Sequence, residues 1–123
     1  IYHDAAIISK MDQKTIEKSL NMPFRAPMLI VGICQYKEHE KVPRHEQLIT
    51  TGCALQNMQM AALAQGFNGM WRTGAFATND QVRRAFNLAS EDEIVGFLYL
   101  GTPATVTPVK KQKPLADYVE YWG

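Results

Sequence analysis

Residues 45–74 read HEQLITTGCALQNMQMAALAQGFNGMWRTG, and this stretch decides the fold. Its first part, residues 45–65, predicts one long helix. Apolar residues recur in it at the helical repeat of about 3.6 positions. They form two stripes: Leu48, Gly52, Leu55 and Ala62 on the first, and Ile49, Cys53, Met60 and Leu63 on the second. A helix that is apolar on most of its circumference must be buried on most sides.

Small residues in this helix indicate what buries it. They let neighbouring backbones approach closely, and they are Gly52, Ala54, Ala61, Ala62 and Ala64. A chain of 123 residues has few other elements that could surround so long a central helix. We therefore expect the helix to pack against its twin in a second subunit. Gly66 follows directly and is expected in the left-handed conformation that ends many helices.

Two shorter helices are predicted on either side of this stretch. Residues 12–21 combine apolar and charged positions at helical spacing, and Asp12 is a suitable N-cap. Residues 78–88 predict the second helix. Either Thr78 or Asn79 could cap it, because both side chains carry an oxygen that accepts from the first-turn N–H groups.

Three segments predict strands. The apolar runs 28–36 and 93–101 are rich in residues that favour strands, and both are expected to be covered on both faces, with 93–101 in the centre of the sheet. Residues 67–72 predict a shorter strand, in which Gly69 marks a bulge or a close approach of another group.

Residues 102–123 contain three prolines and few residues suited to a core, so they predict an extended arm. An aromatic cluster near its end could dock on another surface: Tyr118, Tyr121 and Trp122. The whole chain, residues 1–123, is predicted to be a single domain of the α+β class, a three-layer sandwich of a mixed β-sheet flanked by helices. Because the first residue is Ile1 rather than Met, we expect this chain to belong to a larger protein.

Charge and cysteine content narrow the possible functions. Thirteen basic and twelve acidic residues give a net charge of +1, which does not suit a nucleic-acid-binding face. No apolar stretch approaches the roughly 20 residues that span a bilayer. Cys34 and Cys53 are predicted to be buried free thiols, which fits a reducing compartment and therefore the cytoplasm.

The histidines of HEKVPRHE (39–46) do not predict a metal site. A zinc-protease pattern needs two histidines four residues apart on one helical face. Here His39 and His45 are six apart, and Pro43 interrupts any helix. We therefore predict a charged surface loop and no metal. No spacing in the chain predicts a Ser-His-Asp or Cys-His arrangement either, so no catalytic side chain is assigned.

GFNGMWRTG (66–74) allows two interpretations. In the structural one, Gly66 ends a helix and Trp71 fills a core. In the functional one, residues 72–74 form a turn whose backbone lies against a flat ring and donates N–H groups to it, while Arg72 binds anionic oxygens. Trp71 would then form one wall of the pocket. A site without an acid, a base or a nucleophile suits a protein whose cofactor does the chemistry.

Four segments taken together resemble the FMN-dependent nitroreductase family, in particular its small, minimal-length branch. They are PFRAPMLIVG (23–32), PRHE (43–46), TGCALQNMQMAALAQGFNGMWRTGAF (51–76) and VGFLYLGTP (95–103). The likeness extends over essentially the whole chain. A Gly-Phe-x-Gly-x-Trp element alone would be weak evidence of this family. The resemblance is specific because the last two segments follow each other in the family's order.

The resemblance implies a homodimer with two FMN sites at the subunit interface, built around the long central helix. It implies that Trp71, Arg72, Thr73 and Gly74 lie along the flavin, and that Ala61 marks the point where the helix approaches the cofactor. It further implies NAD(P)H as co-substrate and a ping-pong transfer of reducing equivalents to a small-molecule acceptor of the nitroaromatic, quinone or enone type.

One element of the family pattern is missing from these 123 residues. The family's Arg-Arg-Ser-type motif, which the resemblance assigns to the FMN phosphate, does not occur; Arg83 and Arg84 are followed by Ala85 in a predicted helix. We therefore expect the chain to be the C-terminal two-thirds of a nitroreductase-like domain. Two alternatives stay open: a flavin-binding or dimerisation module without turnover, and a reductive dehalogenase or flavin-fragmenting relative.

Overall fold

The computed structural model describes residues 4, 12–106 and 108–123. Its centre is a three-stranded sheet of β1 (Met28–Cys34), β2 (Asn68–Arg72) and β3 (Glu93–Gly101), in the order β1-β3-β2. The strand predicted to be central, β3, does lie between the other two. Both pairings are antiparallel, so the parallel pairing that a mixed sheet requires is not among the described strands.

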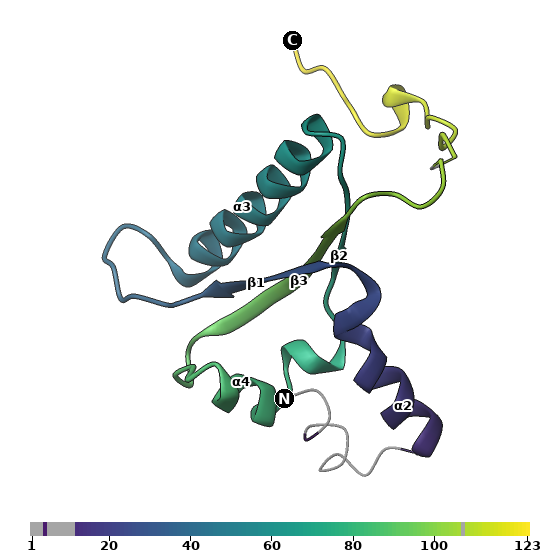
Figure 1. The fold of residues 1–123 in the computed structure, drawn as a ribbon. Helices are drawn as coiled ribbons and strands as arrows, with labels where there is room; N and C mark the ends of the chain where they lie inside the picture. Colours follow the sequence, from purple (N-terminus) through teal and green to yellow (C-terminus); the bar gives the residue numbers. More distant parts are fainter. Residues whose placement is uncertain (1–3, 5–11, 107) are drawn as a thin grey trace.

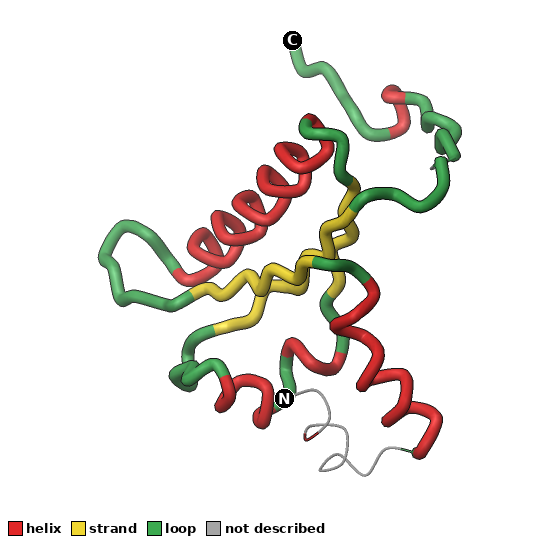
Figure 2. Tube along the Cα trace, in the orientation of Figure 1, coloured by secondary structure: helices red, strands yellow, loops and turns green. Residues whose placement is uncertain are grey.

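Helices cover both faces of this sheet (Figure 1). The long helix α3 (Arg44–Ala64) runs along one face and contacts all three strands. Two shorter helices, α2 (Gln13–Asn21) and α4 (Asp80–Ala85), lie on the opposite side. Figure 2 shows the resulting succession of helix, sheet and helix. The predicted α+β sandwich of three layers is thus confirmed.

The short helices begin at capping residues. Asp12 accepts a hydrogen bond from the backbone N–H of Thr15 at 3.0 Å, as predicted for α2. The Thr15 hydroxyl also donates to this carboxylate at 2.6 Å, and these hydrogen bonds hold the pKa of Asp12 below its usual value. For α4 the cap is Asn79 rather than Thr78, because the Asn79 side chain accepts from the N–H of Gln81 at 2.9 Å.

The helix α4 ends earlier than the predicted boundary at residue 88. The N–H of Phe86 is shared between the carbonyls of Val82 and Arg83, at 3.3 and 3.2 Å, which tightens the last turn. Asn87 then adopts a left-handed conformation with φ of 53°. Asparagine tolerates this conformation better than most residues, and it stops the helix there.

The helix α3 turns only its first apolar stripe towards the sheet. Leu55 and Ala62 from that stripe are buried. The second stripe, which we call the outer stripe, is exposed in this chain: Ile49, Cys53, Met60 and Leu63. The prediction of buried thiols is therefore right for Cys34 and wrong for Cys53, because Cys53 lies on the side of α3 that faces away from the sheet.

On the face away from α3, a core fills the space between the sheet and the neighbouring turns. A short 3-10 turn, η2 (Ala75–Ala77), contributes to it. Its buried members are Phe76, Ala77, Val82, Ile94, Phe97 and Tyr99. On the α3 face, Leu55 lies over Gly32, where a Cβ atom would come within 2.5 Å of the Leu55 Cδ1 atom. Both faces of the sheet are therefore closely packed.

Trp71 lies in a slot between α3 and the sheet. A Cβ atom on Gly96 of β3 would be 1.9 Å from the Trp71 Nε1 atom, and one on Gly52 of α3 would be 3.3 Å from its Cη2 atom. The two glycines thus leave the space that the indole occupies. Gly69 is a point of close approach and not a bulge: its Cβ would lie 2.6 Å from the Leu100 Cδ2 atom, and the β2–β3 register is regular.

A polar cluster ties the start of α3 to the connection between α4 and β3. The Arg44 guanidinium donates to the backbone carbonyl of Glu91 at 2.7 Å and pairs with Glu93. It also lies over the ring of Tyr36. The buried Asp92 carboxylate accepts from the N–H of Tyr36 at 3.0 Å. This cluster is structural, because its members satisfy one another.

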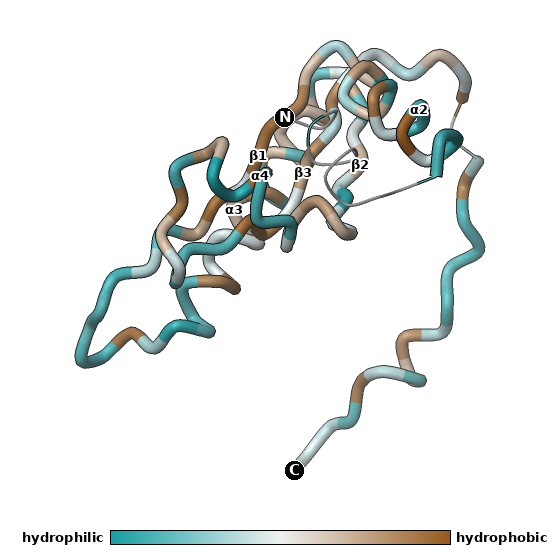
Figure 3. Tube along the Cα trace, turned by 90° about the horizontal axis from the view of Figure 1, so that it is seen from below, coloured by the Kyte–Doolittle hydropathy of each residue, from teal (hydrophilic) through white to brown (hydrophobic). Residues whose placement is uncertain are grey.

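The predicted extended arm is observed after β3. Residues 102–106 and 108–123 lead away from the folded body with one short 3-10 turn, η3 (Leu115–Asp117), as Figures 1 and 3 show. Tyr121 and Trp122 near the end of the arm are 90% and 92% exposed. The other described residues therefore leave these two aromatic side chains uncovered.

The slot for Trp71 yields a stability prediction. Gly96→Ala is expected to destabilise the fold by about 3 kcal/mol or more, because the added methyl group overlaps the indole and the slot is closed on both sides. Gly66→Ala is the control. No atom lies within 4 Å of its Cβ position, so only the left-handed backbone (φ of 83°) is strained, at about 1–2 kcal/mol. Urea denaturation compares the two, and a Gly96→Ala variant as stable as the Gly66→Ala variant would contradict the packing described.

Candidate functional site

The turn between β2 and η2 contains three of the predicted site residues. Arg72 ends β2, and Thr73 and Gly74 are exposed. Gly74 has φ of 90° and ψ of −170°, a conformation that essentially only glycine adopts. Apart from its two chain neighbours, no described residue has an atom within 4 Å of its Cβ position. Among the described residues, the N–H groups of Thr73 and Gly74 have no hydrogen-bond partner.

The fourth residue of the predicted loop, Trp71, is placed differently. Its indole packs between α3 and β3 and does not line either of the cavities near the turn. The Trp71 side chain therefore packs inside the protein, as the structural interpretation of GFNGMWRTG predicted. Its Nε1–H is buried and has no partner among the described residues. Trp71 holds the end of β2 against α3, and this places Arg72 at the start of the turn.

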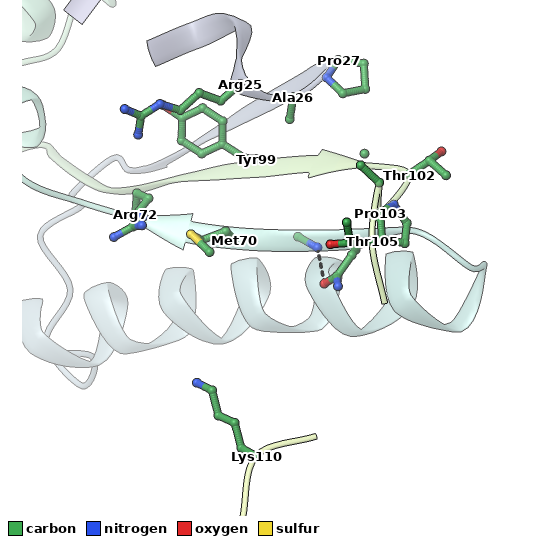
Figure 4. Close-up of a pocket in the computed structure, with 14 residues that line it drawn as sticks. Arg25, Ala26, Pro27, Met70, Arg72, Tyr99, Thr102, Pro103, Thr105 and Lys110 are labelled. Carbon is green, nitrogen blue, oxygen red and sulfur yellow. Dashed lines mark hydrogen bonds between the residues drawn. The ribbon is translucent and has the colours of Figure 1, made fainter. Parts of the chain in front are cut away.

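Arg72 lines a cavity of about 710 Å³ on the face of the sheet opposite α3 (Figure 4). The 3-10 turn η1 (Met22–Arg25) contributes Arg25, and the arm contributes Lys110. Tyr99 of β3 forms part of the wall. No Asp or Glu is among the lining residues, so we call this the cationic cavity. A region with several cations and no carboxylate attracts anionic groups.

Ala61 lines a second, smaller cavity of about 450 Å³ on the other side of the sheet edge. Its walls are mainly apolar side chains: Met28, Ile30, Met58, Phe67 and Leu100. We call it the apolar cavity. The two cavities adjoin, since both are lined by Pro27, Gly101 and Thr102. These three residues stand between a mainly apolar cavity and a cationic one.

The structure thus divides the five predicted residues. Arg72 lies on the cationic cavity and Ala61 on the apolar one, whereas Thr73 and Gly74 form the exposed turn and Trp71 supports it.

Sequence reasoning missed Arg25, Tyr99 and the shared wall at Gly101 and Thr102. Pairing of Met28 with Leu100 brings the start of β1 beside the end of β3, and no local pattern shows such a long-range contact.

The described residues contain no group of three His, Cys, Asp or Glu side chains placed to hold a metal ion. In the charged loop, His39 accepts a hydrogen bond through Nδ1 from the N–H of Lys41 at 3.1 Å, a local turn contact. None of the described helices combines the length with the apolar character that a bilayer span demands.

Known proteins resemble this chain in sequence. The sequence profile of the nitroreductase family matches residues 4–102. A protein of Escherichia coli K12 named "Putative NAD(P)H nitroreductase YdjA" is 50% identical over 103 residues, which are 84% of this chain and 56% of that protein. A Haemophilus influenzae protein named "Putative NAD(P)H nitroreductase" is 32% identical over 80% of this chain and 54% of its own length. The chain therefore spans about half the length of these relatives.

Solved structures show the same fold. A nitroreductase-like family protein from Bacillus cereus superposes with a TM-score of 0.76 at 22% identity, over 98% of this chain and 65% of that one. A structure from Exiguobacterium sibiricum, named "putative nitroreductase in complex with FMN", has a TM-score of 0.55 at 17% identity and covers 97% of this chain and 53% of that one. With the family profile matched over residues 4–102, this chain belongs to the nitroreductase family.

Proposed function

We propose that the protein containing this chain is an FMN-dependent oxidoreductase that passes reducing equivalents from NAD(P)H to nitroaromatic, quinone or enone-type acceptors by a ping-pong mechanism. Family membership supports an oxidoreductase, and the names of the relatives supply NAD(P)H as donor. FMN is bound in the Exiguobacterium sibiricum relative with the same fold. The chain would form the C-terminal two-thirds of a nitroreductase-like domain.

The adjoining cavities carry the proposal. FMN joins a flat, largely apolar ring to a dianionic phosphate. The apolar cavity beside Ala61 fits a ring in size and lining, and the cationic cavity beside Arg72 fits an anionic group. The N–H groups of Thr73 and Gly74 line neither cavity, but they have no hydrogen-bond partner among the described residues and remain available to polar ligand atoms. The residues present therefore fit the cofactor.

The chain's own residues would bind and orient rather than react. FMN, when bound, supplies the hydride chemistry. The backbone N–H groups of Thr73 and Gly74 would donate hydrogen bonds, and the Arg72 guanidinium would offset the negative charge of the ligand. Trp71 keeps the turn in place by its packing between α3 and β3. No side chain in this arrangement has to act as a nucleophile or as a general acid.

The outer stripe of α3 supports a homodimer. Ile49, Met60 and Leu63 are each more than half exposed, and Cys53 lies among them. Contiguous exposed apolar side chains of this kind mark interaction surfaces in soluble proteins. We infer that α3 packs against its twin through the outer stripe, and that the two cofactor sites lie at this interface. The cytoplasmic location stays a prediction.

The cofactor assignment predicts a flavin spectrum and an effect of Arg72. The intact purified protein, incubated with FMN and desalted, is expected to retain absorption bands typical of a flavin. Arg72→Ala is expected to weaken FMN binding by roughly 1–3 kcal/mol, the loss of one charge-assisted contact. Fluorescence titration measures this, with Arg84→Ala, an exposed arginine of α4 outside the cavity, as the control. A colourless intact protein would contradict the assignment.

Turnover separates the enzyme from a flavin-binding module. The intact, flavin-loaded protein is expected to oxidise NAD(P)H in the presence of menadione or a nitroaromatic faster than the same concentration of free FMN. Steady-state absorbance at the reduced nicotinamide band measures the rate. A rate equal to that of free FMN, from protein that retains its flavin, would favour the module without turnover.

The inferred dimer yields a further prediction. Ile49→Asp places a charge in the inferred α3–α3 interface, where it would be desolvated without a partner, and it should convert the dimer to monomers. Phe24→Asp is the matched control, because Phe24 is 84% exposed and lies on η1. Sedimentation velocity reports the masses. Dimers of unchanged stability in the Ile49→Asp variant would place the interface elsewhere.

A further inference from the structure

One polar side chain, Gln56, interrupts the outer stripe of α3. Ile49, Cys53, Met60 and Leu63 are separated by four, seven and three positions, and Gln56 divides the gap of seven into three and four. Alternating steps of four and three are the heptad spacing of helices that pack side by side. Gln56 therefore lies on the same line of side chains, seven residues from Ile49 and seven from Leu63.

The fold leaves the amide of Gln56 unused. The side chain is exposed and takes part in no hydrogen bond among the described residues. On the same helix, Gln59 by contrast donates through Nε2 to the backbone carbonyl of Gly69 at 2.8 Å. If the outer stripe were covered by a purely apolar surface, the Gln56 amide would be buried without a partner, which is unfavourable. The surface that covers the stripe must therefore offer both a donor and an acceptor at this point.

We propose that Gln56 lies on the two-fold axis of the homodimer, where α3 crosses an antiparallel copy of itself and the amide pairs with Gln56 of the partner subunit. An amide side chain has N–H donors and a carbonyl acceptor, so two facing glutamines can exchange two hydrogen bonds. In a contact between two identical surfaces, a residue meets its own copy only near the axis. This inference rests on the homodimer of the proposed function.

The charges of α3 favour a second copy of the chain in the antiparallel direction. No Lys, Arg, Asp or Glu lies between Ile49 and Leu63, so the stripe has no charge to match a charged partner surface. Antiparallel packing sets the positive N-terminal end of each helix beside the negative C-terminal end of the other. With Gln56 on the axis, Ile49 faces Leu63 of the partner subunit. His45, in the first turn, then lies near the last turn of the partner helix, where an imidazole can donate to the last carbonyls.

Such a pair of amides selects the register of the interface. If one helix slid along the other, each Gln56 amide would be buried against an apolar side chain such as Met60 and would lose its partner. A single polar residue on a helical seam is known to fix register and the number of subunits in this way, at some cost in stability. Gln56 is thus a specificity-determining residue of the subunit contact.

Disulfide crosslinking of the intact protein tests the position of the axis. Gln56→Cys and Ile49→Cys are each made in a Cys53→Ser background, in which the remaining Cys34 is buried. Helices packed about 8–10 Å apart bring facing Cα atoms within the span of a disulfide, so Gln56→Cys should form a covalent dimer under mild oxidation. In the antiparallel pair, the two copies of position 49 are separated by roughly 20 Å and should not crosslink.

A mixture of Ile49→Cys and Leu63→Cys proteins is the positive control, because these two positions face each other in the proposed register. Non-reducing electrophoresis shows the products. Crosslinking of Gln56→Cys and of the mixture, but not of Ile49→Cys alone, supports the proposal. It is overturned if Gln56→Cys stays monomeric after oxidation, or if Ile49→Cys alone crosslinks as readily as Gln56→Cys.

Charge variants test whether residue 56 meets its own copy. Gln56→Glu and Gln56→Lys should each raise the dimer dissociation constant about a hundredfold, because two like charges would face each other. An equimolar mixture of the two variants should dimerise again. Asn57→Asp and Asn57→Lys are the matched controls, since this neighbouring side chain points about 100° further round the helix. Sedimentation velocity measures all of them.

Unchanged dimers in the Gln56 variants, no recovery in the mixture, or the same pattern at Asn57 would each contradict the pairing. None of these measurements needs a flavin. If the crosslinking and charge patterns are found in a protein that binds no FMN, the proposed function fails and the axis at Gln56 stands. If a flavin-containing, active dimer does not crosslink at position 56, the function stands and this inference fails.

Discussion

The arrangement of α3, β2 and β3 depends on the packing of the Trp71 indole. Trp71 fits between α3 and β3 only because Gly52 and Gly96 have no side chains, and a methyl group on Gly96 would overlap its Nε1 atom. The contact joins the long helix to the central strand and to the last residues of β2. Arg72 and the open turn at Gly74 follow directly along the chain. The position of the candidate site therefore depends on how Trp71 packs against α3 and β3.

The sheet edge divides the candidate site into an apolar cavity and a cationic cavity. Antiparallel pairing of β1 with β3 places Pro27 next to Gly101, and these residues with Thr102 form the wall between an apolar and a cationic cavity. The apolar side chains come from α3 and β1. The cations come from η1, β2 and the arm. The FMN site proposed above rests on this division.

Much of the fold could be predicted because local patterns decide it. The repeat of apolar residues in 45–65 predicted α3, the apolar run 93–101 predicted the central strand, and Asp12 predicted a cap. The features that the sequence analysis did not predict correctly have other causes. Cys53 lies on an apolar stripe, but the single chain has nothing to cover that stripe. The cationic cavity depends on contacts between residues some 70 positions apart, such as Met28 and Leu100, which periodicity does not reveal.

The slot around Trp71 also links assembly to ligand binding. Its indole rests on Gly52 of α3, the helix whose outer stripe is the inferred seam between subunits, and the next residue, Arg72, lines the cationic cavity. A displacement of α3 would be transmitted through the rigid indole ring to the guanidinium that follows it. In the proposed dimer, the association of two chains would therefore be linked to the position of Arg72 through the side chain of Trp71.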